Sequence, residues 1–172
     1  MIYLYQMANP KKKFSKIYDK YVEQIYRFVF LKVNSQEVAQ DLVSETFLRC
    51  WGAFRNKKDI KNPRAFLYQI ARNLVIDYYR EKGKVVMVSA DSTPLVDPRE
   101  GLEEKTNKNL ELERIKNCLT SLKEEYQNAI IWYYLEGLPV SEIAHLLGKN
   151  EGATRVLISR ALRALKEKIS EA

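Results

Sequence analysis

The chain has 172 residues, of which 46% are hydrophobic and 30% are charged, so it is long enough for one packed domain or two small ones. Its 6 glycines and 5 prolines are few for an all-β protein, and its apolar runs are too short to cross a bilayer. The formal net charge of +7 favours a polyanionic partner, and the first residues lack the pattern of a secretory leader, so we expect a chain that is not secreted.

The residues available for chemistry argue against an enzyme. Cys50 and Cys118 lie far apart and outside any Cys/His cluster, so we expect two reduced packing residues rather than a zinc site. His145 is the only histidine, so a metal site built from several histidines cannot be assembled, and we expect His145 to be a solvated surface residue. No carboxylates are paired for acid–base work, and no Gly-rich loop could hold a phosphate. We therefore expect no metal, no cofactor, no small-molecule substrate and no catalytic activity.

The first half of the chain has the periodicity of amphipathic helices. Residues 1–12 are expected to form an N-terminal arm, after which apolar residues recur at helical spacing over residues 14–33. A second helix is expected to reach residue 54 and to open with a capping box formed by Asn34 and Glu37.

A third helix follows a basic loop. Asn62 is expected to cap this helix and Pro63 to occupy its first position, where proline is favoured. Three helices of this length can form one small bundle, so we expect a first helical domain over residues 13–83. Residues 84–109 lack a helical period over most of their length, which predicts a linker. An ordered loop packed on one domain is the alternative that the sequence leaves open.

Helical periodicity returns from residue 110 and ends in a distinctive motif. Residues 139–165 suit two short amphipathic helices with Gly148 at the turn between them, and Asn150 is expected to cap the second. This is the pattern of a helix-turn-helix, whose second helix enters the major groove of DNA. We therefore expect an all-α protein in which a flexible linker joins the first domain to a second small helical domain over residues 110–172.

The basic residues gather in two places. Residues 1–83 carry 16 Lys/Arg against 8 Asp/Glu, and residues 149–168 carry 6 against 2, whereas residues 84–110 carry 4 against 5. Two basic segments separated by an acidic stretch suit a polyanion that is contacted at two places.

Three segments, in order along the chain, resemble one known family. AQDLVSETFLRCW at residues 39–51 is similar to region 2.2 of bacterial sigma-70-family factors of the extracytoplasmic-function (ECF) group. NPRAFLYQIARNLVIDYYR at 62–80 is similar to regions 2.3 and 2.4, and the motif at 137–162 to region 4.2. The resemblance implies a sigma factor that binds core RNA polymerase, directs promoter-specific transcription initiation by recognising −35 and −10 elements, and helps to open the DNA.

The resemblance also implies partners. These are the β′ clamp helices and the β flap of core polymerase, together with promoter DNA, and outside the holoenzyme the chain is expected to be a cytoplasmic monomer. The family often has a membrane-associated anti-sigma factor, and the sequence leaves open whether this chain has one.

The second expected helix has an acidic face. Asp41, Ser44 and Glu45 lie at positions i, i+3 and i+4 and therefore share one side of the helix. An acidic face on a basic domain is unsuited to DNA, and the resemblance implies that Asp41, Leu42, Ser44 and Glu45 dock on the β′ clamp helices. A solvated helix face is the simpler alternative.

The third expected helix combines basic charge with aromatic rings, a combination that suits a DNA strand whose bases are unpaired. The resemblance places Asn73 in a pocket that receives an extruded base of the −10 element, with residues 57–62 as its rim. The expected −10 contacts are Lys61, Asn62, Arg64, Tyr68, Arg72, Asn73, Asp77 and Arg80.

The −35 element is expected to be read by the second helix of the helix-turn-helix. Arg155 and Arg160 can each bridge guanine O6 and N7 in the major groove. The full set of expected contacts is Glu151, Arg155, Val156, Ser159, Arg160 and Arg163.

The linker bears on how the two domains act together. A free coil of its length is too short to hold the domains two DNA turns apart, so we expect them to lie together in the free chain and to bind promoter DNA poorly until polymerase extends the linker. The rival hypothesis is a stand-alone helix-turn-helix regulator with a helical sensor or dimerisation domain. It explains the C-terminal motif but not the aromatic residues and Asn73 among the basic residues of the first domain.

Overall fold

The computed structural model describes residues 10–56, 59–88 and 107–171, and every regular element within these ranges is helical, which confirms the all-α expectation. Among the described residues, no helix is both long and apolar enough to cross a membrane. The elements are α1 (Pro10–Val33), α2 (Gln36–Arg55), α3 (Pro63–Val88), α4 (Asn107–Thr120), α5 (Glu124–Ile130), the π-helix η1 (Ile131–Leu135), α6 (Val140–Leu147) and α7 (Glu151–Glu171).

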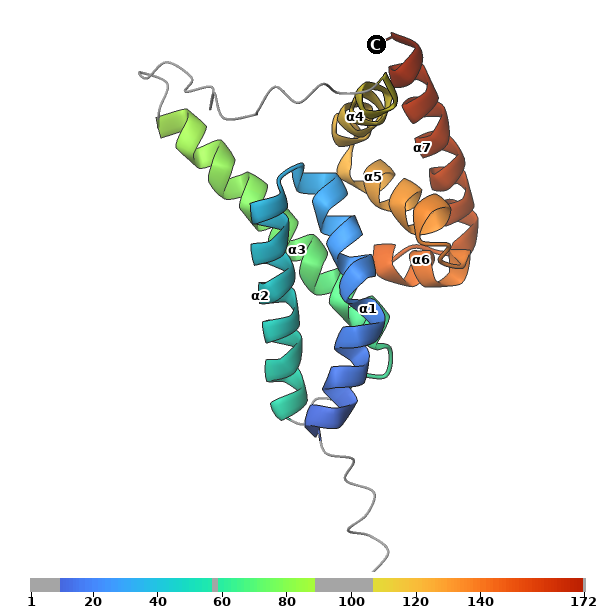
Figure 1. Cartoon of the computed structure of the whole chain (residues 1–172). Coiled ribbons are helices and arrows are strands. Elements are labelled where there is room, and N and C mark those ends of the chain that lie inside the picture. The colour runs from blue at the N-terminus through green and yellow to red at the C-terminus, as the bar shows by residue number, and fades with distance from the viewer. Residues whose placement is uncertain (1–9, 57–58, 89–106, 172) are drawn as a thin grey trace, which may run out of the picture.

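Helices α1, α2 and α3 pack on one another and form the N-terminal bundle (Figure 1). Each helix turns an apolar stripe inward, because its apolar residues recur every three or four positions. At one end the ring of Phe14 lies 5.1 Å from that of Trp51 and 6.1 Å from that of Phe54. The fully buried aliphatic residues of this bundle include Ile25, Val29, Ala39, Leu67 and Ala71.

Helices α4 to α7 form the C-terminal bundle, in which α4, α5 and α6 all pack on the long helix α7. Gly148 ends α6 with a φ of +64°, a left-handed conformation that glycine adopts without steric cost, and the chain then turns into α7. Asn150 caps α7 by accepting a 2.8 Å hydrogen bond from the Ala153 N–H. The predicted helix-turn-helix, with its turn and its cap, is therefore confirmed.

In the N-terminal bundle the start of α3 follows the sequence expectation, whereas α1 begins at Pro10, inside the expected arm, and α2 has a different cap. Asn62 caps α3, since its Oδ1 accepts from the Ala65 N–H at 3.0 Å, and Pro63 is the first helical residue. The predicted capping box at Asn34 is wrong. Asn34 has a φ of 53° and terminates α1, so the cap of α2 passes to Ser35, whose hydroxyl accepts from the Val38 N–H at 3.4 Å.

The predicted linker is shorter than residues 84–109. Helix α3 continues to Val88 and α4 begins at Asn107, so both ends of that segment are helical. Residues 89–106 of the expected linker and residues 1–9 of the expected arm lie outside the described residues, whereas residues 10–12 belong to α1.

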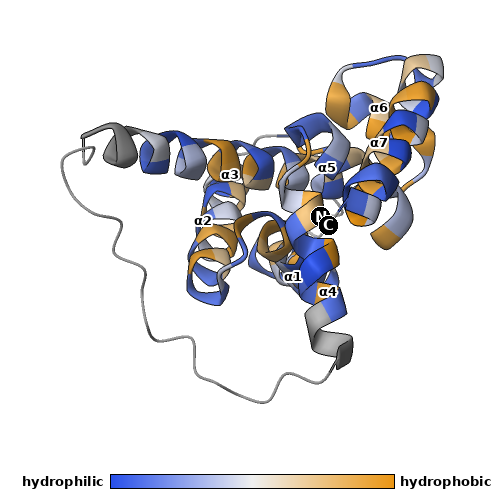
Figure 2. Ribbon diagram, turned by 90° about the horizontal axis from the view of Figure 1, so that it is seen from above, coloured by the Kyte–Doolittle hydropathy of each residue, from blue (hydrophilic) through white to orange (hydrophobic). Residues whose placement is uncertain are grey.

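The two bundles lie against each other (Figures 1 and 2), and we call the surface between them the junction. α1 contacts α4, α3 contacts α6, and the buried apolar residues of both bundles form one continuous cluster. The Lys116 ammonium lies 3.7 Å from the centre of the Phe30 ring, which joins α4 to α1. This arrangement agrees with the expectation that the domains lie together in the free chain.

Candidate nucleic-acid interface

The acidic face of α2 is open to solvent. Asp41 and Ser44 are exposed, Glu45 is half-buried and accepts a 2.6 Å bond from Arg49, and Leu42 is half-buried against the core. The structure thus brings these four residues to the outer side of the N-terminal bundle, away from α3.

Leu48 belongs to the same face, although the sequence analysis missed it. Its side chain is 62% exposed, and it lies four residues after Ser44 and three after Glu45, one turn along the same side of α2. Its position in the helical repeat could have identified it, because Leu48 falls on the polar stripe of α2 whereas Phe47 falls on the buried stripe. A large exposed apolar side chain one turn beyond the carboxylates is well suited to anchor a basic partner helix.

The residues expected at the −10 element fall into two groups. Five of them are exposed, although the Asn62 amide is already used as a cap and Asp77 lies 3.4 Å from Arg80. These five are Lys61, Asn62, Asn73, Asp77 and Arg80. The other three lie in the junction, where the C-terminal bundle covers them.

Arginines of the N-terminal bundle form ion pairs with glutamates of the C-terminal bundle across the junction. In each pair the guanidinium donates through Nε and Nη2 to the two oxygens of one carboxylate, which is the two-bond geometry that arginine favours. The Nε bond measures 2.9 Å for Arg27 and 2.7 Å for Arg64 and Arg72. The pairs are Arg27 with Glu136, Arg64 with Glu142 and Arg72 with Glu124.

The sequence analysis did not select Arg27, because one basic residue among others on a helix of mixed polarity forms no recognisable motif. Only the fold shows that it faces the same bundle as Arg64 and Arg72 do. The bonds to Glu136 and Glu142 raise the pKa values of Arg27 and Arg64, so both stay charged throughout the physiological range.

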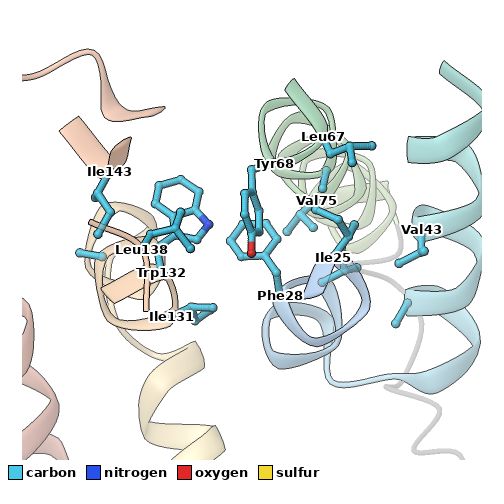
Figure 3. Packing of buried hydrophobic residues seen from close by; sticks show 14 of the residues in the cluster. Ile25, Phe28, Val43, Leu67, Tyr68, Val75, Ile131, Trp132, Leu138 and Ile143 are labelled. Carbon is cyan, nitrogen blue, oxygen red and sulfur yellow. The ribbon is translucent and has the colours of Figure 1, made fainter. Parts of the chain in front are cut away.

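Tyr68 lies at the centre of the junction. Its ring meets Phe28 of its own bundle and Trp132 of the other, with centroid separations of 5.3 and 5.7 Å, and Phe28 stacks on Trp132 at 5.6 Å (Figure 3). All three side chains are fully buried, and burial raises the pKa of Tyr68. A DNA base can reach Tyr68 only after the bundles separate. The Tyr68 hydroxyl and the Trp132 Nε1 have no hydrogen-bond partner among the described residues.

Lys32 is the buried cation of the junction. Its ammonium donates a 2.5 Å hydrogen bond to the Asn128 amide oxygen and lies 3.7 Å from the carboxylate of Glu124. Burial lowers the pKa of Lys32 to about 8, and Glu124 only partly offsets this loss of solvation. Burial alone would raise the pKa of Glu124, but hydrogen bonds from Arg72 and Asn128 and the charge of Lys32 lower it.

A hollow of about 450 Å³ lies between α3 and α6, and it is large enough for a nucleobase. Residues 59–62 form its rim, Phe66 and Gln69 line one wall, and His145 and Leu146 of α6 border it from the other bundle. Asn73 does not line this hollow, because it lies one turn beyond Gln69 on α3. The structure therefore brings residues 59–62 of the expected rim to a pocket and leaves Asn73 outside it, whereas residues 57 and 58 of that rim lie outside the described residues.

The recognition helix α7 presents its expected residues to solvent. All six are exposed, and Arg155 pairs with Glu151 one turn away at 2.8 Å. Thr154, Ile158 and Ala161 hold the opposite side of α7 in the core. The six exposed residues are Glu151, Arg155, Val156, Ser159, Arg160 and Arg163.

Comparisons with known proteins point to one family. The chain matches the family model Sigma-70 region 2 over residues 17–85 and the model Sigma-70, region 4 over residues 112–165. It is 31% identical to the ECF RNA polymerase sigma factor BldN of Streptomyces coelicolor, over 92% of this chain and 61% of BldN. It is 29% identical to the ECF RNA polymerase sigma factor SigM of Bacillus subtilis, over 88% of this chain and 91% of SigM.

The fold has a counterpart among solved structures. The sigma factor RpoE from Bartonella quintana, solved with the anti-sigma factor NepR, superposes with a TM-score of 0.71 at 23% identity. The superposition covers 92% of this chain and 98% of RpoE, so the two chains share the arrangement of two helical bundles.

Proposed function

The chain belongs to the sigma-70 family as an ECF sigma factor, and we propose that it binds core RNA polymerase and directs promoter-specific transcription initiation. One observation carries this proposal. The matches to regions 2 and 4 follow each other along the chain and fall on the two helical bundles that the structure contains.

The N-terminal bundle docks on polymerase through α2. Asp41, Ser44 and Glu45 meet basic residues of the β′ clamp helices, which orients the encounter, and Leu48 adds an apolar anchor one turn further along the same face. Leu42 supports this face from the core side. The β flap of polymerase is the expected partner of the C-terminal bundle.

The same bundle holds the −10 element once the duplex opens. The hollow at residues 59–62 takes an extruded base, with Phe66 and Gln69 as its wall. Lys61, Arg64, Arg72 and Arg80 supply cations for the backbone of the strand, and Asn62, Tyr68, Asn73 and Asp77 supply base contacts along α3. Tyr68 joins them only when the junction has opened.

The C-terminal bundle binds the −35 duplex through α7. Arg155 and Arg160 read guanines in the major groove, Val156 and Ser159 lie between them, and Glu151 accepts from cytosine amino groups. Arg163 contacts a phosphate, which positions the helix without reading sequence.

The remaining expectations follow from this role. Such a factor works where polymerase and the chromosome are, so we propose a cytoplasmic monomer without catalytic activity of its own. A membrane-associated anti-sigma factor stays a prediction. The stand-alone regulator is not favoured, because the region 2 match accounts for the N-terminal bundle that a regulator leaves unexplained.

The decisive experiment is run-off transcription with reconstituted core polymerase on a pool of genomic promoter fragments. We expect new transcripts only when both proteins are present, and we expect the chain to co-purify with core polymerase. An Arg155→Ala variant should keep polymerase binding and lose those transcripts. If the chain neither associates with polymerase nor changes where RNA synthesis starts, the proposal is wrong.

A further inference from the structure

The glutamates in the junction occupy positions at which arginines of the N-terminal bundle bind anions. A guanidinium that donates two parallel bonds to a carboxylate has the geometry with which it also binds a phosphate. The exposed fractions of the Arg27, Arg64 and Arg72 side chains are 50%, 29% and 27%, so solvent reaches each arginine, whereas the carboxylates of Glu136 and Glu142 are only 1% and 11% exposed. The three carboxylates therefore mark three anion-binding positions on one side of the N-terminal bundle.

Helix α6 blocks the pocket as well as the cations. Glu142 in its first turn binds Arg64, and one turn later His145 and Leu146 border the hollow at residues 59–62. One helix of the C-terminal bundle thus lies where both the backbone and a base of a DNA strand would have to lie.

The other functional surfaces stay open in the same arrangement. The residues of α7 expected at the −35 element are exposed, and so are Asp41, Ser44 and Leu48 on α2. Packing of the bundles therefore covers only the part of the −10 surface that lies in the junction, namely Arg64, Tyr68 and Arg72.

We infer that the junction face of the N-terminal bundle has two mutually exclusive occupants, the C-terminal bundle and the backbone of a single DNA strand. Arg27, Arg64 and Arg72 bind phosphates where Glu136, Glu142 and Glu124 now sit. Arg27 on α1 is thereby a DNA contact outside the expected −10 set. The inference rests on the proposed function and deepens it, because it says what keeps the −10 surface unavailable in the free chain.

This competition has a defined order in the holoenzyme. Polymerase and the −35 duplex bind first to the closed chain, in which the two bundles pack together. Both can bind because the surfaces that they contact, on α2 and α7, are exposed. The −10 strand then replaces three carboxylates by phosphates, so the number of ion pairs on the arginines is conserved. The contacts that are lost are the apolar contact of Trp132 with Phe28 and Tyr68, the bond from Lys32 to Asn128, and the contact of Lys116 with Phe30.

The test uses the full chain with glutamate-to-glutamine changes. A junction variant carries Glu124→Gln, Glu136→Gln and Glu142→Gln, and a control variant carries Glu111→Gln, Glu167→Gln and Glu171→Gln. The control residues are exposed on the same bundle, so both variants change the net charge equally. The probe is a fluorescein-labelled single-stranded DNA of mixed sequence and about 12 nucleotides, followed by fluorescence anisotropy.

The junction variant should bind the probe about tenfold more tightly than the control variant, which corresponds to about 1.4 kcal/mol. Adding Arg27→Gln to the junction variant should weaken binding and reduce the slope of log affinity against log salt by about 0.7, as expected for one lost phosphate contact on a single strand. The inference is overturned if the two glutamine variants bind alike, or if Arg27→Gln leaves the slope unchanged.

Run-off transcription separates this inference from the proposed function. A wild-type chain that directs transcription while both glutamine variants bind the probe alike refutes only the competition at the junction. A wild-type chain that fails to direct transcription refutes the proposed function. Small-angle scattering on the junction variant should show an expanded chain while circular dichroism shows an unchanged helix content, which excludes simple unfolding.

Discussion

Lys32 is a charged residue whose side chain is buried in the junction between the bundles. Its side chain is 2% exposed, and the charged groups that face it are Glu124 at 3.7 Å and, further away, Arg72. A buried ammonium is costly unless it is bonded, and here Asn128 supplies the bond. The residue therefore couples the closed arrangement to proton binding.

Closure should depend on pH in the alkaline range. The pKa of Lys32 is about 8 in the closed chain and returns toward its usual 10.5 when the bundles separate and water reaches it. The closed chain then binds fewer protons between these values, so raising the pH from about 7 to about 9.5 should favour closure. Small-angle scattering should show a smaller radius of gyration at the higher pH.

Lys32→Met provides the control for this dependence, because methionine keeps the length of the side chain without the charge. The variant should be closed at both pH values. A radius that grows with pH in the wild type, or an unchanged trend in Lys32→Met, would contradict the assignment to Lys32.

Leu48 is the second residue with a measurable role. Leu48→Ala should weaken binding to core polymerase by about tenfold, since a leucine side chain buried at an interface contributes about 1.5–3 kcal/mol. The thermal stability of the chain should not change, because the side chain is exposed in the free protein. Val156→Ala, a change of an exposed apolar residue on α7, should leave polymerase affinity intact. Equal polymerase affinities for wild type and Leu48→Ala would exclude the anchor.

At the scale of the elements, local chemistry made most boundaries predictable. The caps at Asn62 and Asn150 and the turn at Gly148 depend on a few neighbouring residues, so the sequence contains all the information needed. The start of α2 was misplaced by one residue because both Asn34 and Ser35 are good caps. Because α1 ends at Asn34, which has a left-handed conformation, the cap of α2 is Ser35.

Two glycines that differ only in backbone conformation test this local account. A Cβ added at Gly148 or at Gly52 would meet nothing within 4 Å, so neither substitution creates a clash. Gly148→Ala should destabilise the chain by about 1–2 kcal/mol because φ is +64°. Gly52→Ala, in the interior of α2, should stabilise it by about 0.5–1 kcal/mol. Thermal unfolding of both variants measures the difference, and equal signs would disprove the backbone explanation.

The arrangement of the whole molecule was less accessible to sequence reasoning. Resemblance and charge indicated two helical domains, and on the same grounds we expect α3 and α7 to contact DNA. The pairing of Arg27 with Glu136 joins residues 109 positions apart, and no local pattern reports such a contact. Tyr68 was selected as an aromatic residue on a basic helix, yet the fold buries it beneath Trp132.

Trp132 should report on the separation of the bundles. In a Trp51→Phe background it is the only tryptophan, and in the closed chain it is fully buried. An excess of the single-stranded probe should shift its emission maximum to longer wavelengths as the junction opens and water reaches the indole. An emission maximum that stays constant while anisotropy shows bound DNA would mean that the strand binds the closed chain.

The π-helix η1 sets the rotational phase between Trp132 and the helix-turn-helix. Its wider turn is closed by the bond from the Glu136 N–H to the Ile131 oxygen, five residues back, so it holds one residue more than an α-helical turn would. Deleting that one residue would rotate everything downstream by about 100° relative to α5. Each half could still fold, but Glu142 would no longer point at Arg64 when Trp132 points at Phe28. The extra residue of η1 thus keeps the two contacts between the bundles, Trp132 with Phe28 and Glu142 with Arg64, in register.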